Sequence, residues 1–421
     1  MVSVQSIRRT ALPLWVAAVA VLLLAANLRV AVNAVGATLP EMRTTLGMSG
    51  AAAGLLTALP PFCFGLMGLA GPALARRIGL ERTALLSALV LTAGQLVRAA
   101  VPGQVWVLAG SSVALAAIAL ANVVMPSLIR KLFPQRMAAM TTAYTAIMTL
   151  FAALTSFVTL PIQAAFGADY RLGLGMWAIL SLLAVLPWLS AIRSHPFAAE
   201  PGATPADGVE TAPTPARRIR LAELARVPKA WILAALFGTQ SLQAYIVFGW
   251  LTTLLHDEGL STEAASAQVG VVSLAATVAT LFAPTMIGRM RRPATLTWVL
   301  TAAYAGGYLG LLLAPTTLTV LWSALIGIGQ AFFPIAMYLV NLRAKTHEGV
   351  LSLSAFMQCV GYAYAGTALF VLGTVHGSST SWTGVLIFVL ALCVIQQACA
   401  LVGIRRWVIE DELAARDQRP S

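Results

Sequence analysis

Charged side chains are scarce in this chain of 421 residues. Asp, Glu, Lys and Arg together make up 10% of it, whereas hydrophobic residues make up 59%. A soluble domain of ordinary composition carries about 25% charged residues. So few charged side chains cannot make the surface of a folded chain of this length compatible with water. The composition therefore excludes an ordinary soluble protein and indicates a surface that lies in lipid.

The chain also lacks the motifs of an enzyme or a cofactor protein. It contains no glycine-rich loop of the kind that cradles ATP phosphates, which excludes an ATP-driven pump within this chain. Its four cysteines are Cys63, Cys359, Cys393 and Cys399, and they lie in apolar runs without the spacing of metal ligands. We therefore expect no catalytic residues, no metal and no cofactor.

Long apolar runs recur along the whole sequence, without the alternating ten-residue strands of a membrane barrel. A run that crosses about 30 Å of hydrocarbon must satisfy its own backbone, which only a helix can do here. The sequence predicts an all-α membrane protein with twelve transmembrane helices near residues 12–39, 50–75, 83–100, 104–129, 137–165, 171–192, 230–255, 263–288, 294–313, 317–342, 349–374 and 382–404. The first run is too long for a cleaved signal peptide and has no clear cleavage site, so we expect it to be retained.

The positive charges fall on one side of this predicted topology. Of 27 Lys and Arg residues, 23 lie in the loops and tails that share a side with both termini. The remaining four are Arg29 within the first helix and Arg43, Arg98 and Arg171 on the other side. This distribution predicts that both termini are cytoplasmic. Because the charges are spread over many short loops, we do not expect a nucleic-acid partner.

A proline-rich polar segment divides the chain into two halves. Residues 193–229 have the composition of a linker, and we expect it to be cytoplasmic. It separates an N-terminal six-helix bundle, residues 1–192, from a C-terminal bundle, residues 230–421, which ends in a short tail. The cluster at 217–220 is expected either to lie against anionic headgroups or to be solvated.

Two pairs of motifs indicate that the halves are related. Gly47-Met48-Ser49 precedes the second helix as Gly259-Leu260-Ser261 precedes the eighth, 212 residues later. Asn122 lies four residues before Pro126, and Gln330 lies four residues before Pro334. A duplicated six-helix unit predicts two pseudo-symmetric bundles with a substrate site between them near mid-membrane.

Several segments resemble the cyanate and 2-nitroimidazole transporter branch of the major facilitator superfamily: NLR at 27–29, LGMS at 46–49, AGLLTALP at 53–60, RRIGLER at 76–82, ANVVMP at 121–126, GTQSLQAY at 238–245 and MQCVGY at 357–362. The resemblance spans both halves. It implies twelve helices in two bundles, alternating access and transport of a small polar or anionic solute. The chain departs from the superfamily pattern where Ala75, Arg76 and Arg77 replace an expected acidic residue, and where a later proline of the eleventh helix is missing from 366–369.

Arg29 is the charged residue that falls unambiguously within a predicted span. All 15 carboxylates and all four histidines lie in loops or at the ends of helices. A titratable proton relay in the membrane core is therefore disfavoured, and so is a cationic substrate. A guanidinium is a fixed fork of donors that matches the oxygens of a small anion. The alternative for Arg29 is a structural role, either reaching toward the membrane surface or bonding helix carbonyls.

Polar and aromatic residues on the same helices complete the predicted substrate site. Asn33 shares a helix face with Arg29, and Gln240 and Gln243 occupy the equivalent region of the second half. Each polar member could instead serve as a hydrogen bond between helices, and the aromatic members could serve as packing. The complete predicted set is Arg29, Asn33, Asn122, Tyr144, Gln240, Gln243, Tyr245, Gln330, Phe333, Gln358 and Tyr362.

The sequence thus predicts a secondary transporter of a small anion or small polar solute, such as cyanate, a nitroimidazole or a short carboxylate. We expect it in the inner (plasma) membrane, as a monomer whose partners are its substrate and the lipid bilayer. A drug or metabolite exporter is the alternative within transport. A transporter-like sensor or structural membrane protein is a further alternative, although the chain carries no soluble signalling domain.

Overall fold

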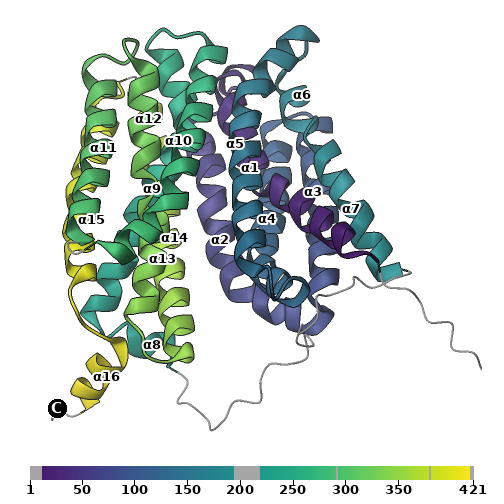
Figure 1. Ribbon diagram of the computed structural model, residues 1–421. Coiled ribbons are helices and arrows are strands. Elements are labelled where there is room, and N and C mark those ends of the chain that lie inside the picture. The colour runs from purple at the N-terminus through teal and green to yellow at the C-terminus, as the bar shows by residue number, and fades with distance from the viewer. Residues whose placement is uncertain (1–11, 194–218, 291–292, 379–380, 418–421) are drawn as a thin grey trace, which may run out of the picture.

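A computed structural model of the chain describes residues 12–193, 219–290, 293–378 and 381–417, and every element in these ranges is an α-helix. Two groups of helices stand side by side (Figure 1). The first group contains α1 (Leu14–Thr45), α2 (Gly50–Ile78), α3 (Leu80–Ala100), α4 (Gln104–Leu132), α5 (Met137–Ala165), α6 (Tyr170–Gly175) and α7 (Ala178–Arg193).

The second group follows the segment that begins after Arg193. It contains α8 (Leu221–Leu224), α9 (Pro228–Asp257), α10 (Thr262–Arg289), α11 (Pro293–Leu313), α12 (Thr319–Gly329), α13 (Phe332–Leu342), α14 (His347–Ser378), α15 (Thr383–Ile404) and α16 (Ile409–Asp417). We call the end of the molecule where α7 ends and α9 begins the linker side, and the opposite end the far side. The short helices α8 and α16 lie at the linker side (Figure 1).

The predicted twelve spans are confirmed. Within the described residues, twelve segments are long and apolar enough to cross a membrane, with α6 and α7 forming one of them and α12 and α13 another. The tenth span is interrupted at Gln330 and Ala331, between α12 and α13. Pro334 has no N–H, so it cannot donate to the carbonyl of Gln330 four residues earlier, and the helical ladder breaks there.

The repeated Gly-x-Ser motif has the same structure in both halves. Gly47 and Gly259 both adopt positive φ, at 58° and 102°, which ends the preceding helix at little steric cost. Ser49 and Ser261 then cap the next helix, each accepting a hydrogen bond of 3.2 Å from the backbone N–H three residues ahead. The relationship between the two halves is therefore visible at the level of individual hydrogen bonds.

The first helix is longer than the sequence predicts. We expect it to end near residue 39, yet it continues through Pro40 to Thr45. Glu41 fixes this last stretch, because its carboxylate accepts hydrogen bonds from the Gln163 amide at 2.5 Å and from the backbone N–H of Tyr170 at 3.0 Å. The carboxylate thus ties the far end of α1 to α5 and to the start of α6.

The two bundles touch closely at the far side. Gly54 of α2 faces Gly373 of α14, and Gly36 of α1 faces the backbone carbonyl of Phe248 of α9, with no room for a side chain at either contact. The hydroxyl of Ser266 in α10 donates a hydrogen bond of 2.7 Å to the carbonyl of Ser156 in α5. These contacts join three pairs of helices across the interface and close the far side.

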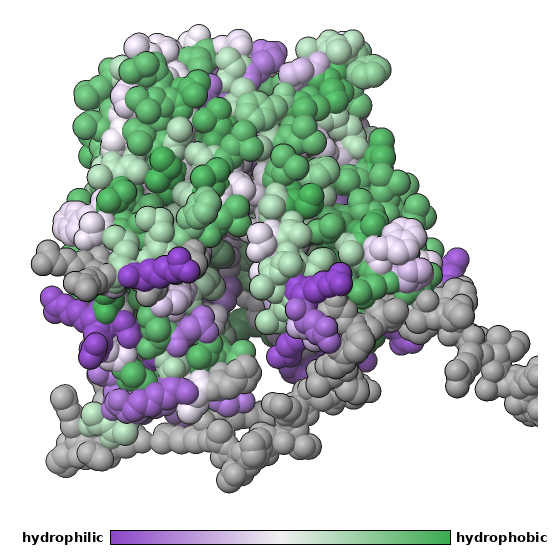
Figure 2. All heavy atoms as spheres, viewed as in Figure 1, coloured by the Kyte–Doolittle hydropathy of each residue, from purple (hydrophilic) through white to green (hydrophobic). Residues whose placement is uncertain are grey.

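The linker side is open between the bundles. Figure 2 shows the surface hollowed there, with hydrophilic residues on both rims and a broad hydrophobic belt across the visible face above them. The belt is the surface expected of a protein embedded in lipid. The space between the bundles is therefore reached from the linker side and sealed from the far side.

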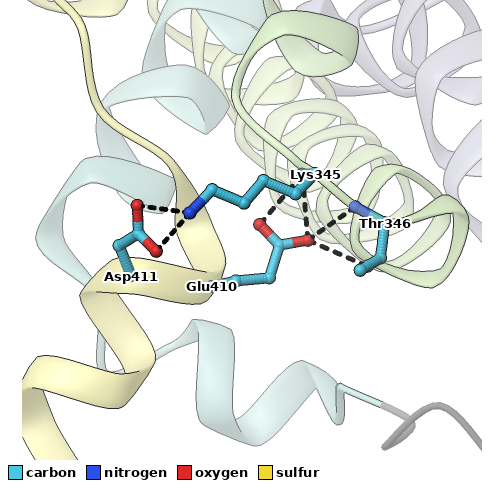
Figure 3. Close-up of polar contacts among 4 residues, drawn as sticks. All are labelled: Lys345, Thr346, Glu410 and Asp411. Carbon is cyan, nitrogen blue, oxygen red and sulfur yellow. Dashed lines mark hydrogen bonds and ion pairs between the residues drawn. The ribbon is translucent and has the colours of Figure 1, made fainter.

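A cluster of polar contacts holds α16 against the linker side of the second bundle (Figure 3). Glu410 accepts hydrogen bonds from the backbone N–H groups of Lys345 and Thr346, at 3.1 and 3.0 Å, and from the Thr346 hydroxyl at 2.8 Å. Lys345 also reaches Asp411, with Nζ 2.6 Å from Oδ1. Desolvation opposes ionisation of Glu410, but the hydrogen bonds outweigh it and leave its pKa below the usual value.

Candidate functional site

Arg29 lies half-buried in the middle of α1, at the interface between the two bundles. Its guanidinium carbon stands 5.5 Å from the ring centroid of Phe248 on α9, a cation–π contact from one bundle to the other. Arg29 also acts electrostatically on the hydroxyl groups of Tyr245 in α9 and Tyr362 in α14. The structure thus brings together three residues of the predicted site, Arg29, Tyr245 and Tyr362, and adds Phe248.

Arg29 forms no ion pair among the residues that the structure describes. The three acids of the first bundle have other partners: Glu41 bonds Gln163 and Tyr170, Glu81 pairs with Lys131 at 2.6 Å, and Asp169 lies 3.7 Å from Arg171. Within the described ranges, the cation therefore faces an aromatic ring and hydroxyl groups and not a carboxylate. An intramembrane cation without a carboxylate partner is a strong candidate for a ligand-binding group.

A small pocket lies beside Tyr245, between the Arg29 region and the closed far side. It is lined by Val32, Val35, Leu56, Thr57, Pro60, Leu115, Tyr245 and Gly249. These residues come from α1, α2, α4 and α9, so both bundles contribute to its walls. The pocket is apolar apart from the hydroxyl groups of Thr57 and Tyr245.

Aromatic rings form a wall near Tyr362. The ring centroid of Tyr362 lies 5.6 Å from that of Phe64 in α2, in a stacked arrangement, and 4.9 Å from that of Phe237 in α9, edge to face. Phe237 in turn lies 5.9 Å from Phe333 of α13, which is 37% exposed. The predicted residues Tyr362 and Phe333 therefore belong to one continuous wall, and Phe64 and Phe237 are members that sequence reasoning missed.

Two predicted residues are engaged inside their own bundles. The Asn33 amide of α1 donates to the Ala152 carbonyl at 2.9 Å and to the Ser156 hydroxyl at 3.1 Å, both in α5. Gln243 is fully buried and bonds Gln396 of α15, while the Cys393 thiol lies 3.5 Å from its carbonyl oxygen. These contacts hold helices together and do not bring Asn33 or Gln243 to the Arg29 contact.

The other predicted residues make no described interaction with Arg29. Asn122 bonds the Ile118 carbonyl of its own helix at 3.0 Å, and Gln358 bonds Ser354 at 2.9 Å. Gln240 is buried beside Ser241, and Tyr144 is half-buried in the linker-side half of α5. Gln330 is buried at the helix break, and its amide nitrogen has no hydrogen-bond partner among the described residues.

Arg98, which the sequence analysis assigns to the side opposite the termini, has surroundings that the sequence does not predict. The residue is fully buried near the end of α3. Its terminal nitrogens donate to the carbonyls of Ala31 in α1 and Leu174 in α6, at 3.2 and 3.4 Å. Arg98 therefore serves as a structural arginine, and it provides a natural contrast to Arg29.

The described residues contain no group of three or more His, Cys, Asp or Glu that could hold a metal ion. The arrangement around Arg29 can instead attract, orient and release a small solute without changing its covalent structure.

Comparison with known proteins agrees with this architecture. The sequence pattern of the Major Facilitator Superfamily matches residues 18–366. The 2-nitroimidazole transporter of Escherichia coli is 29% identical over 86% of this chain and 88% of its own length. The cyanate transport protein CynX of the same organism is 26% identical, over 86% of this chain and 90% of its own. An uncharacterized transporter, YycB of Bacillus subtilis, is 28% identical over 93% and 94%.

Solved structures show the same fold at low sequence identity. The nucleoside transporter NupG superposes with a TM-score of 0.70 at 14% identity, covering 93% of this chain and 99% of that one. A bacterial homolog of the human lysosomal transporter Spinster gives a TM-score of 0.67 at 14% identity, with 94% of each chain covered. The resemblance inferred from the sequence motifs and the two-bundle fold are both confirmed.

Proposed function

The chain belongs to the Major Facilitator Superfamily and is a membrane transporter, not an enzyme, and from this premise we propose that it carries a small anion or a small polar planar solute, with Arg29 as the ligand for negative charge. The observation that carries the proposal is the position of Arg29 at the interface of the bundles, against Phe248 and without a carboxylate partner among the described residues. The substrate then provides the missing counter-charge.

The geometry favours a planar solute. Arg29 offers parallel N–H donors to carboxylate-like or nitro oxygens, while Tyr362, Phe64 and Phe237 present ring faces and edges. The names of two relatives, a transporter of 2-nitroimidazole and one of cyanate, support this class. Both molecules are small and carry electron-rich atoms that a guanidinium can bind.

We propose that the linker side faces the cytoplasm and that the protein lies in the inner membrane of a bacterial cell. The excess of Lys and Arg on that side and the bacterial source of the relatives support this orientation. The structure then represents an inward-open state. Transport requires the contacts between Gly54 and Gly373 and between Gly36 and Phe248 to separate, while the bundles close over the linker side.

A single chain supplies both halves of the proposed site, with Arg29 from the first bundle and Tyr245 and Phe248 from the second. We therefore propose that the protein works as a monomer.

Flux into proteoliposomes tests the proposed substrate class. Purified protein is reconstituted, and uptake of labelled cyanate, 2-nitroimidazole and short carboxylates is measured with and without a proton gradient. The proposal predicts saturable flux of at least one of them. The absence of flux for every compound, together with flux of bulky lipophilic cations, would identify a drug exporter and overturn it.

A further inference from the structure

A second cluster of functional side chains lies at the closed far side, away from Arg29. Trp250 of α9 is its centre. The indole N–H donates to the hydroxyl of Thr57 in α2 at 2.9 Å, across the interface between the bundles. The guanidinium carbon of Arg43, from α1, stands 6.0 Å from the centroid of the Trp250 ring. Both contacts must break when the far side opens, because each joins the first bundle to the second.

His376 from α14 completes this cluster. Its ring centroid lies 3.9 Å from that of Trp382, next to α15, and 5.8 Å from that of Trp250. The two tryptophan rings are 5.9 Å apart, so the imidazole is enclosed by indoles. The residue is only 6% exposed although it belongs to the last turn of its helix.

The two nitrogens of His376 have different surroundings. Nε2 lies 3.9 Å from a carboxylate oxygen of Asp257, which also accepts a hydrogen bond of 2.9 Å from the Trp382 indole. Nδ1 is buried and has no hydrogen-bond partner among the described residues. A neutral ring with its proton on Nε2 fits this geometry. A second proton, on Nδ1, would add a buried donor without an acceptor, which is costly.

Two charged groups act on the His376 ring, and they act in opposite directions. Arg43 of α1 repels an imidazolium, and Asp257 of α9 attracts it. The Asp257 side chain is 37% exposed, so water weakens its attraction. The neighbouring His256 is turned toward the Leu260 carbonyl and the Thr262 hydroxyl and does not enter the cluster. Burial of the ring among the indoles and the missing acceptor at Nδ1 therefore favour the neutral form of His376 in the closed arrangement.

We infer that His376 is a proton-binding site that controls the opening of the far side. Opening separates Arg43 and Thr57 from Trp250 and admits water to the enclosed ring, so the proton binds more tightly to the open state than to the closed state. By linkage, acidification on that side shifts the equilibrium toward the open state. This site needs no acid in the membrane core, and it does not depend on the role of Arg29.

The inference is tested by a distance measurement without any transported substrate. Spin labels are placed on two exposed residues of the far side, Thr45→Cys in the first bundle and Glu258→Cys in the second, in full-length protein whose four native cysteines are replaced. Distance distributions are recorded in nanodiscs at several values between pH 5 and pH 8. We expect the long-distance, open population to grow on acidification by up to about tenfold per pH unit, the limit for one linked proton.

His376→Gln and His376→Asn are the decisive variants, because neither side chain takes up a proton in this range. The open population should then be independent of pH in each of these variants that size-exclusion chromatography shows to be folded. His256→Gln is the matched control, because His256 lies outside the cluster, and it should retain the pH response. A wild-type protein with no pH response, a response that survives in both His376 variants, or a response that disappears in His256→Gln would overturn the inference.

Discussion

The guanidinium of Arg29 lies over the ring of Phe248, with 5.5 Å between its carbon atom and the ring centroid. One residue belongs to the first bundle and the other to the second, so the contact crosses the interface that alternating access must rearrange. A cation held by an aromatic face retains unused hydrogen-bond donors. This is the property that a binding site for a small anion requires.

Arg98 provides the comparison for Arg29. We expect Arg98→Met to lower the free energy of unfolding by about 1–3 kcal/mol, because the substitution removes two hydrogen bonds to the carbonyls of Ala31 and Leu174. Thermal unfolding in detergent measures the loss. Substrate affinity of the folded fraction should not change. A loss of affinity at wild-type stability would show that Arg98 belongs to the transport pathway.

The two serine caps should contribute equally. Ser49→Ala and Ser261→Ala each remove one side-chain acceptor at the start of a helix, and each is expected to cost about 1 kcal/mol. Chemical or thermal denaturation of the two variants measures the difference directly. A cost at one serine and none at the other would contradict the structural equivalence of the two motifs.

The hydrogen bond between Trp250 and Thr57 should stabilise the closed far side. Thr57→Val keeps the shape of the side chain but removes the acceptor, and we expect it to favour the open state by about 1 kcal/mol, or about fivefold in population. The spin-labelled pair described above reports this ratio. Thr252→Val is a matched control, since the Thr252 hydroxyl is buried on α9 and makes no hydrogen bond among the described residues. Equal effects of the two variants would assign no role to the bond.

The docking of α16 should depend on pH through Glu410. The pKa of this carboxyl is lowered in the folded protein, so its contribution to stability is present above the unfolded pKa and is lost as the pH falls through the folded pKa. We expect hydrogen exchange of residues 409–417 to be slow near neutral pH and to accelerate, relative to the intrinsic rate, in the acid range below about pH 4.3.

Glu410→Gln should show fast exchange of this segment already at neutral pH, because the carboxylate that binds Lys345 and Thr346 is absent. Asp411→Asn is the control. Its only described partner is the exposed Lys345 ammonium group, so the effect should be small. Protection in Glu410→Gln equal to that of the wild type would refute the proposed role of Glu410.

The architecture was predictable because the constraints that determine it are local in sequence. A transmembrane span must contain about 20 apolar residues, and positive loops must share a side. Three consecutive residues determine each of the turns at Gly47 and Gly259. The glycine adopts positive φ, and the serine two residues later caps the next helix. All twelve spans were therefore predictable, whereas the break before Pro334 could be anticipated only as a possible kink.

The candidate site was only partly predictable, because a sequence does not reveal how each helix is rotated about its axis. Asn33 and Gln243 were equally plausible ligands for a solute and for neighbouring helices, and the structure directs them to α5 and α15. Arg98 lies close to a helix end, where an arginine ordinarily reaches water, yet here α1 and α6 cover it. No sequence pattern distinguishes Phe248 or His376 from other residues of the same type, so neither could be predicted as part of a site.

Equilibrium binding to Arg29 variants tests the central claim most directly. The probe is whichever of labelled cyanate, 2-nitroimidazole or a short carboxylate the wild-type protein transports. Arg29→Gln should weaken binding by about 10- to 150-fold, the loss of a charge-assisted contact of about 1.5–3 kcal/mol, and Arg29→Lys should recover part of it. Unchanged affinity in folded Arg29→Gln would show that Arg29 is structural and would contradict the account.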